Sequence, residues 1–260
     1  MDVAPADLTR LAPAPGSRLA VVGGCGGIGR ALVAAARAAE LKVAVLDLPA
    51  SIAAHPPPED VLTLALDATR EDEVATAFAA LRDAWGWLDV LVNLAGFTNR
   101  KVPVADVGAD EWQEIVDGNL RAAYLSCRHA LPLMPSGAIV NMASGLANRL
   151  LPGYGAYGAA KAGVIALTKA LAIENAPHVR ANAVAPGAVD TAFLRGGTGR
   201  GGEVEGAVLQ LDPGPYVATI PLGRIAVPDD VVGPILFLAG DASRYMTGQV
   251  LHINCGSLTP

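Results

Sequence analysis

Residues 19 to 37 read Leu19-Ala-Val-Val-Gly23-Gly-Cys-Gly-Gly-Ile-Gly29-Arg-Ala-Leu-Val-Ala-Ala-Ala-Arg37. The apolar start has the composition of a buried strand, the glycines predict a turn, and the alanine-rich end has the pattern of a helix. Glycines at such a turn allow the backbone to approach a pyrophosphate, which binds the free amides at the start of the helix. A glycine-rich turn alone also fits a tight connection without a ligand, but strand, turn and helix occur here in the order that a nucleotide site requires.

A second strand pattern begins at residue 42 and ends in an acid, Asp47. A carboxylate at this place accepts hydrogen bonds from both hydroxyls of an adenosine ribose and repels a 2′-phosphate. Leu48 supplies no cation, and no residue of the glycine-rich turn is basic. The pattern therefore favours NAD over NADP. The alternative is that Asp47 only caps a surface turn before Pro49.

Tyr157 and Lys161 lie four residues apart in a helical pattern, so their side chains share one face of the helix. A neighbouring ammonium favours the phenolate, so the pKa of Tyr157 is expected to fall from roughly 10 toward neutral pH and allow proton exchange. Ser144 lies thirteen residues before Tyr157, directly after an apolar run, which predicts a hydroxyl at the carboxyl end of a strand. Alone, a tyrosine and a lysine at this spacing also fit a half-buried tyrosine that hydrogen-bonds water.

Together with the glycine-rich turn, these residues resemble the short-chain dehydrogenase/reductase family over residues 18 to 256. The resemblance implies that Tyr157 transfers the proton and that Ser144 holds the reacting oxygen. It also implies that Lys161 binds the nicotinamide ribose and lowers the pKa of Tyr157.

A fourth residue, Asn119, matches the family asparagine that holds a water beside the active-site lysine within a locally distorted helix. The helical pattern from residue 110 to residue 134 is interrupted at Gly118, which makes an irregular helix plausible there. Without the other site residues, Asn119 would equally fit a polar residue that faces solvent in the middle of a helix.

The family's nucleotide loop reads Thr-Gly-x-x-x-Gly-x-Gly. Gly23, Gly27 and Gly29 match its glycines, and Val22 replaces the threonine that would brace the loop. The resemblance further implies cofactor contacts from residues near the ends of the predicted strands. These are Cys25, Gly26, Ile28, Asp47, Leu48, Asp67, Ala68, Asn93, Ala95, Gly96, Pro186, Gly187, Val189 and Thr191, with Tyr157 and Lys161. Thr69 is expected to cap the helix that follows Asp67.

A long segment, residues 192 to 220, contains five glycines within residues 196 to 202 and is expected to form a substrate lid. Candidates for the substrate pocket are mostly apolar, which favours a neutral secondary alcohol or ketone over a phosphorylated sugar. These candidates are Ser144, Leu146, Asn148, Leu151, Tyr154, Ala188, Phe193 and Leu194.

The length of 260 residues, with no Ser/Gly/Pro-rich linker in the middle, predicts one domain from residue 18 to residue 260 after a loose leader, residues 1 to 17. Hydrophobic residues make up 52% and charged residues 17%, as suits buried parallel strands covered by alanine-rich helices. A net charge of −6 without a basic stripe argues against nucleic acid and anionic membranes as partners.

The three cysteines, Cys25, Cys127 and Cys255, are odd in number and far apart, which argues against disulfides and against a Cys-x-x-Cys metal site. The four histidines are scattered, so no metal is expected. The first residues are acidic rather than basic, and no run approaches the length of a membrane span, so we expect a cytoplasmic protein.

These patterns predict a doubly wound parallel sheet of about seven strands, with helices on both faces and the cofactor at the carboxyl ends of the strands. We expect an NAD-dependent oxidoreductase that interconverts a secondary alcohol and its ketone by hydride transfer, and the resemblance implies a homotetramer. An alternative enzyme is a reductase of 3-oxoacyl thioesters of acyl carrier protein or CoA, which more often prefers NADPH. An alternative of another class is a nucleotide-binding regulator without turnover, because a fold alone does not establish activity.

Overall fold

Seven parallel strands form one sheet in the computed structural model, which describes residues 10–98, 101–195 and 213–257. The strands are β1 (Arg18–Val22), β2 (Lys42–Asp47), β3 (Leu62–Ala65), β4 (Val90–Asn93), β5 (Gly137–Met142), β6 (Val179–Pro186) and β7 (Val250–Ile253). Their order across the sheet is β3-β2-β1-β4-β5-β6-β7, and every pairing is parallel. The central strands are apolar runs because a parallel sheet is covered on both faces.

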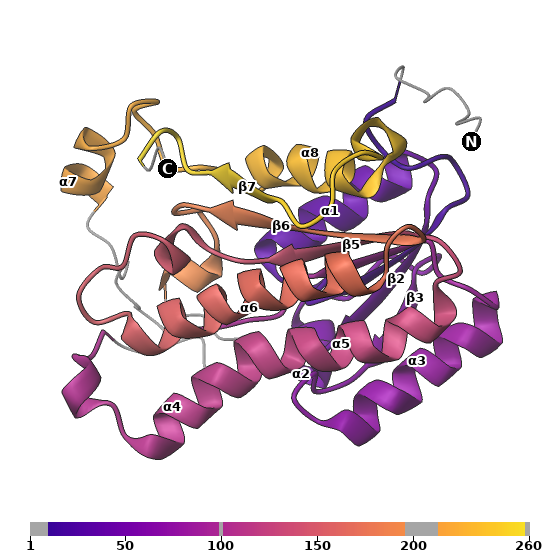
Figure 1. Ribbon diagram of the computed structural model, residues 1–260, viewed down its shortest axis with the longest axis horizontal. Helices are drawn as coiled ribbons and strands as arrows, with labels where there is room; N and C mark the ends of the chain where they lie inside the picture. Colours follow the sequence, from indigo (N-terminus) through magenta and orange to yellow (C-terminus); the bar gives the residue numbers. More distant parts are fainter. Residues whose placement is uncertain (1–9, 99–100, 196–212, 258–260) are drawn as a thin grey trace.

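Helices cover both faces of this sheet (Figure 1). They are α1 (Gly27–Ala38), α2 (Pro49–Ala54), α3 (Glu71–Trp85), α4 (Ala109–Val116), α5 (Ala122–Ala130), α6 (Gly155–Glu174), α7 (Pro213–Ala218) and α8 (Pro228–Ala239). On one face α1 and α8 pack against each other, whereas α3, α5 and α6 lie on the other face, with α4 beside α6.

The strand order reverses at the centre of the sheet. From β1 the chain continues outward to β2 and β3, and it then returns to place β4 on the other side of β1. The connections after β1 and β4 therefore leave a crevice between them at the carboxyl ends of the strands, which is where nucleotides bind in folds of this kind. The predicted doubly wound α/β fold is confirmed.

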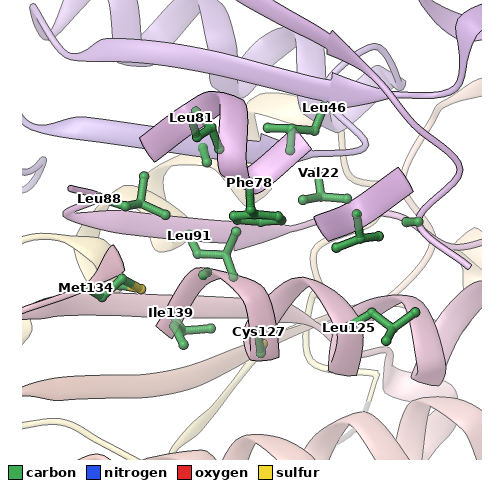
Figure 2. Packing of buried hydrophobic residues seen from close by; sticks show 14 of the residues in the cluster. Val22, Leu46, Phe78, Leu81, Leu88, Leu91, Leu125, Cys127, Met134 and Ile139 are labelled. Atoms are coloured by element: carbon green, nitrogen blue, oxygen red, sulfur yellow. The ribbon is translucent and has the colours of Figure 1, made fainter. Parts of the chain in front are cut away.

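Two apolar cores lie on the two faces of the sheet, because successive side chains of a strand point to opposite faces. One core contains Phe78 of α3 and Leu125 of α5 (Figure 2). The other contains Leu32 of α1 and Ile235 of α8. These cores hold the sheet and its flanking helices in one arrangement, and the carboxyl ends of the strands lie at their edge.

A buried polar chain connects the centre of the sheet to α6. Asn93 Nδ2 donates to Oδ1 of Asn141 at 2.7 Å, and the two residues are partners in the β4/β5 register. Asn141 Nδ2 donates to Oγ1 of Thr168 at 3.0 Å, and that hydroxyl donates to the carbonyl oxygen of Val164 at 2.7 Å. All three polar side chains are buried, so these hydrogen bonds satisfy groups that water does not reach.

The helical stretch that contains Asn119 is irregular, as predicted. Between α4 and α5, residues Asp117–Arg121 form a short π-helical segment, and Gly118 and Asn119 are buried in it. A Cβ atom at Gly118 would collide with the ring of Phe97, so this helix approaches the chain after β4 more closely than any other residue would allow.

The helix after Asp67 begins later than the sequence predicts. Its N-cap is Arg70, and Thr69 lies outside the helix, where its Oγ1 donates to Oδ1 of Asp67 at 2.7 Å. The predicted Thr69 cap is therefore wrong, because Asp67 binds both the hydroxyl and the backbone N–H of Thr69 and holds it in a local turn.

One helix, α6, is long and apolar enough by length and composition to cross a membrane, which corrects the expectation that no run has this length. Half of its apolar window is buried within the fold, against β6, α4 and the π-helical segment. It also carries Tyr157 and Lys161. These contacts are those of a core helix of a globular protein.

Glu40 ends α1 in the left-handed backbone region, with a φ of 62°. The N–H of Glu40 binds the carbonyl oxygen of Arg37, and the N–H of Leu41 binds that of Ala36, which is the Schellman arrangement. Because a Cβ atom is strained at such a φ, we expect Glu40→Gly to raise the free energy of unfolding by about 1 kcal/mol and the melting temperature by about 2–4 °C.

Thermal and urea unfolding of both proteins measure this difference. Glu40→Ala is the matched control, since it removes the carboxylate and keeps the strained Cβ atom. If alanine stabilises the protein as much as glycine does, the gain comes from the lost charge and the backbone explanation is contradicted.

Candidate active site

A large cleft of about 770 Å³ opens at the carboxyl ends of the strands. Its walls come from the segments that follow β1, β2, β3, β4, β5 and β6, together with the first turn of α6 and the segment after β7. Its size lies in the range of sites that enclose a cofactor and a small substrate.

The glycine-rich loop after β1 forms one wall of the cleft. Gly23 has a φ of 85°, and a Cβ atom at Gly27 would lie 2.6 Å from the side chain of Thr191. No side chain caps the start of α1, and its first turn contains no acidic residue. The first backbone N–H groups of α1 therefore retain free donors at the positive end of the helix dipole, an arrangement that fits a pyrophosphate.

Asp47 lies at the end of β2 beside this loop. Its Oδ2 accepts from the backbone N–H of Cys25 and its Oδ1 from that of Leu48, both at 2.8 Å. These bonds fix the carboxylate, and each oxygen keeps a further lone pair for a ribose hydroxyl. Burial, followed by the nearby charge of Asp47, raises the pKa of the Cys25 thiol to about 12, so that thiol stays protonated at neutral pH.

A cation that the sequence reasoning missed lies at the same end of the cleft. Arg30, one residue after the glycine-rich turn, lines the cleft together with Asp47 and His55. Its Nη1 lies 2.7 Å from Nδ1 of His55, which follows α2. The first turn of α1 thus places Arg30 in the wall that the loop forms, a cation that neither Leu48 nor the glycine-rich turn supplies.

Ser144, Tyr157 and Lys161 come together in the middle of the cleft, and all three line it. Ser144 follows β5, and its Oγ accepts from the backbone N–H of Leu146 at 3.2 Å. The Tyr157 ring lies 5.9 Å from the ring of Phe193, centroid to centroid, and the Lys161 Nζ atom lies 5.7 Å from the Tyr157 centroid. The Ser144 hydroxyl at the end of β5 thus lies near the phenol of Tyr157 and the amine of Lys161, which are four residues apart on α6.

The ionisation of this group differs from the sequence expectation. Burial raises the pKa of Tyr157 to about 12, and a hydrogen bond with Ser144 opposes that shift only in part. Burial also lowers the pKa of Lys161 to about 7. The expected fall of the Tyr157 pKa is wrong for the chain alone, because the ammonium is itself destabilised by burial and does not outweigh the desolvation of the phenolate.

The lysine is held from one side by the strand and from the other by a glycine turn. Its Nζ donates to the carbonyl oxygen of Met142 at 2.9 Å. A Cβ atom at Gly96 would lie 3.0 Å from Nζ and 2.5 Å from Oδ1 of Asn119, so both groups face this one glycine. The backbone at Gly96 must remain without a side chain for Lys161 and Asn119 to meet there.

Asn119 is oriented by its amide nitrogen. Nδ2 donates to the carbonyl oxygens of Phe97 at 2.7 Å and Ile115 at 2.8 Å. The bond to Ile115 replaces part of the helical ladder that the π-helical segment interrupts. Within the described chain, Oδ1 is buried and has no hydrogen-bond donor. A buried amide oxygen requires a donor, so its orientation fits a water that joins Asn119 to Lys161.

The structure brings most of the predicted cofactor and substrate residues to this cleft and leaves three away from its lining. Asn119 lies behind Gly96. Asn93 is buried in the polar chain between β4, β5 and α6, where its amide bonds to Asn141 instead of facing the cleft. Asn148 is exposed and lies 3.5 Å from His252 of β7, because the turn after Ser144 directs it outward. The remaining predicted residues line the cleft, namely Gly23, Cys25, Gly26, Gly27, Ile28, Gly29, Asp47, Leu48, Asp67, Ala68, Ala95, Gly96, Ser144, Leu146, Leu151, Tyr154, Tyr157, Lys161, Pro186, Gly187, Ala188, Val189, Thr191, Phe193 and Leu194.

The predicted lid lies for its greater part, residues 196–212, outside the described residues. Its two ends are described, as a 3-10 turn over Ala192–Arg195 and as α7. Tyr216 of α7 lines the cleft, and its hydroxyl accepts from the backbone N–H of Ala188 at 3.3 Å. The sequence carried no signal for this residue because the contact joins segments 28 positions apart.

A nucleotide-binding crevice beside a Ser, Tyr and Lys group defines a class of oxidoreductase, and comparison with known proteins gives the family. A family model described as Enoyl-(Acyl carrier protein) reductase matches residues 23–257. The chain belongs to the short-chain dehydrogenase/reductase family. The resemblance inferred from the motifs is confirmed.

Three similar proteins show the breadth of this family. An uncharacterized short-chain type dehydrogenase/reductase of Sinorhizobium fredii is 38% identical over 93% of this chain, which spans only 44% of that relative. A 3-oxoacyl-[acyl-carrier-protein] reductase of Synechocystis sp. is 34% identical, over 91% of this chain and 94% of the relative. The crystal structure of a 3-ketoacyl-(acyl-carrier-protein) reductase from Brucella melitensis, complexed with NADH, superposes with a TM-score of 0.84 at 28% identity, over 94% of this chain and 98% of that one.

Proposed function

We propose that this protein is an NAD-dependent oxidoreductase that interconverts a secondary alcohol and its ketone. The observation that carries the proposal is the convergence of Ser144, Tyr157 and Lys161 in the cleft, with the unpaired Oδ1 of Asn119 directed toward the lysine. Asp47 at the adenosine end supports NAD, and the similar Brucella melitensis reductase was crystallised with NADH.

The chain's own residues supply proton transfer and orientation. A bound nicotinamide would supply or accept the hydride. The pKa of Tyr157, raised to about 12 by burial, keeps the phenol protonated at neutral pH, so it donates its proton to a carbonyl oxygen during reduction. The Ser144 hydroxyl holds that oxygen by a hydrogen bond. Lys161 lies beside the phenol and would bind the cofactor ribose. Asn119, with a water between it and Lys161, would complete the path for the proton.

A regulator without turnover is not favoured by this geometry. Burial of Lys161, which lowers its pKa to about 7, destabilises the fold, and neither this lysine nor the buried phenol beside it serves nucleotide binding at the adenosine end. Groups with perturbed pKa values in a cleft are typical of catalysis. Measured turnover distinguishes an enzyme from a regulator, because a fold alone does not establish activity.

A second candidate is the reduction of 3-oxoacyl thioesters, which the Synechocystis sp. relative favours. The two candidates share the same proton donor and differ in substrate and cofactor preference. A panel of secondary alcohols, ketones and 3-oxoacyl thioesters, each assayed with NAD(H) and NADP(H), distinguishes them. The cytoplasmic location and the homotetramer stay predictions, the latter for light scattering to test.

Cofactor preference gives the direct test of the proposed site. We expect kcat/KM with NAD to exceed that with NADP by about 10- to 100-fold, because Asp47 repels a 2′-phosphate in a partly desolvated cleft. Arg30 offsets part of this repulsion, so the Arg30→Gln variant should widen the preference for NAD. The double variant with Asp47→Ser and Leu48→Arg should shift preference toward NADP.

Steady-state kinetics of the three proteins with both cofactors measure these ratios. Asp60→Asn is a matched control, since it removes an exposed carboxylate that is paired with Arg37 outside the cleft. Equal efficiency of the two cofactors in the native enzyme, or a preference for NADP, would show that Asp47 does not contact the ribose.

A further inference from the structure

Backbone hydrogen bonds in the turn after Ser144 fix the position of Arg149. The backbone N–H of Arg149 donates to the carbonyl oxygen of Gly145 at 3.0 Å, and that of Ala147 donates to the carbonyl oxygen of Ser144 at 3.0 Å. A Cβ atom at Gly145 would lie 3.4 Å from the carbonyl oxygen of Pro186, so this turn packs closely against the end of β6. The turn therefore couples the position of Arg149 to that of the Ser144 hydroxyl.

The Arg149 side chain reaches across the end of the cleft to the chain after β7. Its Nη1 donates to the carbonyl oxygen of Ser257, and both residues line the cleft. Within residues 10–98, 101–195 and 213–257, Arg149 forms no ion pair. A guanidinium has five N–H donors, and the single carbonyl leaves most of them for another partner.

Arg149 is exposed at the rim of the cleft, and apolar residues line the same cleft. Leu146, Leu151 and Phe193 line the cleft on this side of Ser144. Asp47 ends β2 and Asp67 follows β3, both on the other side of β1 from β5, the strand that precedes Arg149.

A third acid of the cleft, Asp190, follows β6, where its backbone N–H donates to the carbonyl oxygen of Ala226 and its neighbour Thr191 packs against Gly27 of the nucleotide loop. Arg149 follows β5, so it approaches the cleft from a different strand end.

We propose that Arg149 binds an oxyanion of the substrate, remote from the reacting carbon, and so makes the enzyme select substrates with an apolar body and an anionic end. The inference rests on the proposed oxidoreductase function and names the substrate class for it. A guanidinium fork pairs with a carboxylate or a phosphate through two parallel hydrogen bonds, which fixes the direction of the bound molecule. With the oxyanion at Arg149, the apolar body lies along Leu146 and Leu151 and the reacting carbon lies toward Tyr157. This proposal differs from the expectation of a neutral substrate, and the paired substrates below distinguish the two.

Two sources supply such an oxyanion, and paired substrates distinguish them. The first pair is a medium-length 3-oxo acid and its methyl ester. The second is a 3-oxoacyl phosphopantetheine and the same acyl group on N-acetylcysteamine, which lacks the phosphate. Each pair differs by one anionic group and keeps the reacting ketone, so the ratio of KM values within a pair isolates the contribution of the anion.

We expect Arg149→Gln to raise KM for the anionic member of one pair by about 10- to 100-fold and to leave KM for its neutral partner within about twofold. Arg149→Lys should raise this KM less than Arg149→Gln does, because lysine keeps the positive charge although it lacks the two parallel donors of the guanidinium. Arg82→Gln is the matched control, since Arg82 is exposed on α3, pairs with Asp83 and lies outside the cleft. The pair that shows selectivity identifies the source of the oxyanion.

Equal effects of Arg149→Gln on the anionic and neutral members of both pairs, or no effect on either, would overturn the inference and leave the proposed function in place. A uniform loss accompanied by a lower melting temperature would mean that Arg149 only anchors the chain at Ser257. If the native enzyme turns over other ketones of the panel but none of these four substrates, the inference is overturned and the proposed function stands. Absence of turnover across the whole panel of secondary alcohols, ketones and thioesters would instead overturn the proposed function.

Discussion

Tyr157→Phe is expected to lower kcat by about 10²- to 10⁴-fold, the usual contribution of a positioned proton donor. The substitution removes only the hydroxyl, and the ring keeps its place 5.9 Å from the ring of Phe193. The Ser144 hydroxyl loses one partner but retains the backbone N–H of Leu146. The loss should therefore appear in kcat, with little change in the affinity for NADH.

Stopped-flow or steady-state rates measure kcat, and a fluorescence titration measures the affinity for NADH. Tyr245→Phe is the matched control, because Tyr245 is fully exposed and the same atom is removed there. Retention of more than about a tenth of the native activity by Tyr157→Phe would exclude the phenol as the proton donor.

Lys161→Met is expected to lower activity by at least about 100-fold and yet to stabilise the fold. The lysine is 2% exposed, and its hydrogen bond to the carbonyl oxygen of Met142 supplies no countercharge. A buried charge without a partner destabilises the folded state, whereas methionine fills a similar volume without that penalty. Such a gain is typical of sites where function is retained at the expense of stability.

The stabilisation should depend on pH in a defined direction. Burial lowers the pKa of Lys161 to about 7, whereas an unfolded lysine titrates near about 10.4. Between these pH values the unfolded chain binds more protons than the folded chain, so the free energy of unfolding of the native protein rises with pH. Below about pH 7 both states are protonated and the penalty of the buried ammonium is largest.

Urea unfolding of the native protein and of Lys161→Met at about pH 6 and about pH 9.5 measures this effect. The gain from methionine should be larger at the lower pH by a few kcal/mol. Lys169→Met is the control, since Lys169 is exposed on the same helix, α6. A gain of equal size at both pH values would contradict the buried-charge explanation.

The sequence predicted those features that depend on neighbours along the chain. Three of these features are local patterns with local physical causes. They are the glycine turn after residue 22, the acid at the end of β2, and the helical spacing of Tyr157 and Lys161. The irregular helix at Asn119 was predictable for the same reason, because Gly118 is adjacent. The doubly wound parallel sheet was predictable as well, because strands that alternate with helices pair in parallel.

The sequence did not predict contacts between distant segments. Arg149 bonds to Ser257, 108 positions later, and Arg30 meets His55 only because the first turn of α1 and the end of α2 lie at the same side of the cleft. The pKa of Tyr157 also depends on the whole fold, because burial by many residues outweighs one neighbouring charge. Burial of this kind is a sum over the packed structure and has no signature in any short motif.

The polar chain of Asn93, Asn141 and Thr168 makes assembly of the active site depend on the correct pairing of β4 with β5. Two of its members are cross-strand partners in β4 and β5, and the third lies on the helix that carries Tyr157 and Lys161. A shift of β5 by one residue would turn Asn141 to the opposite face and leave the hydroxyl of Thr168 without its amide donor. The same shift of β4 would remove Asn93 as the donor to Asn141. Misaligned forms of the sheet therefore lack both the hydrogen bonds and the seating of α6, so the reacting groups come together only on the correctly paired sheet.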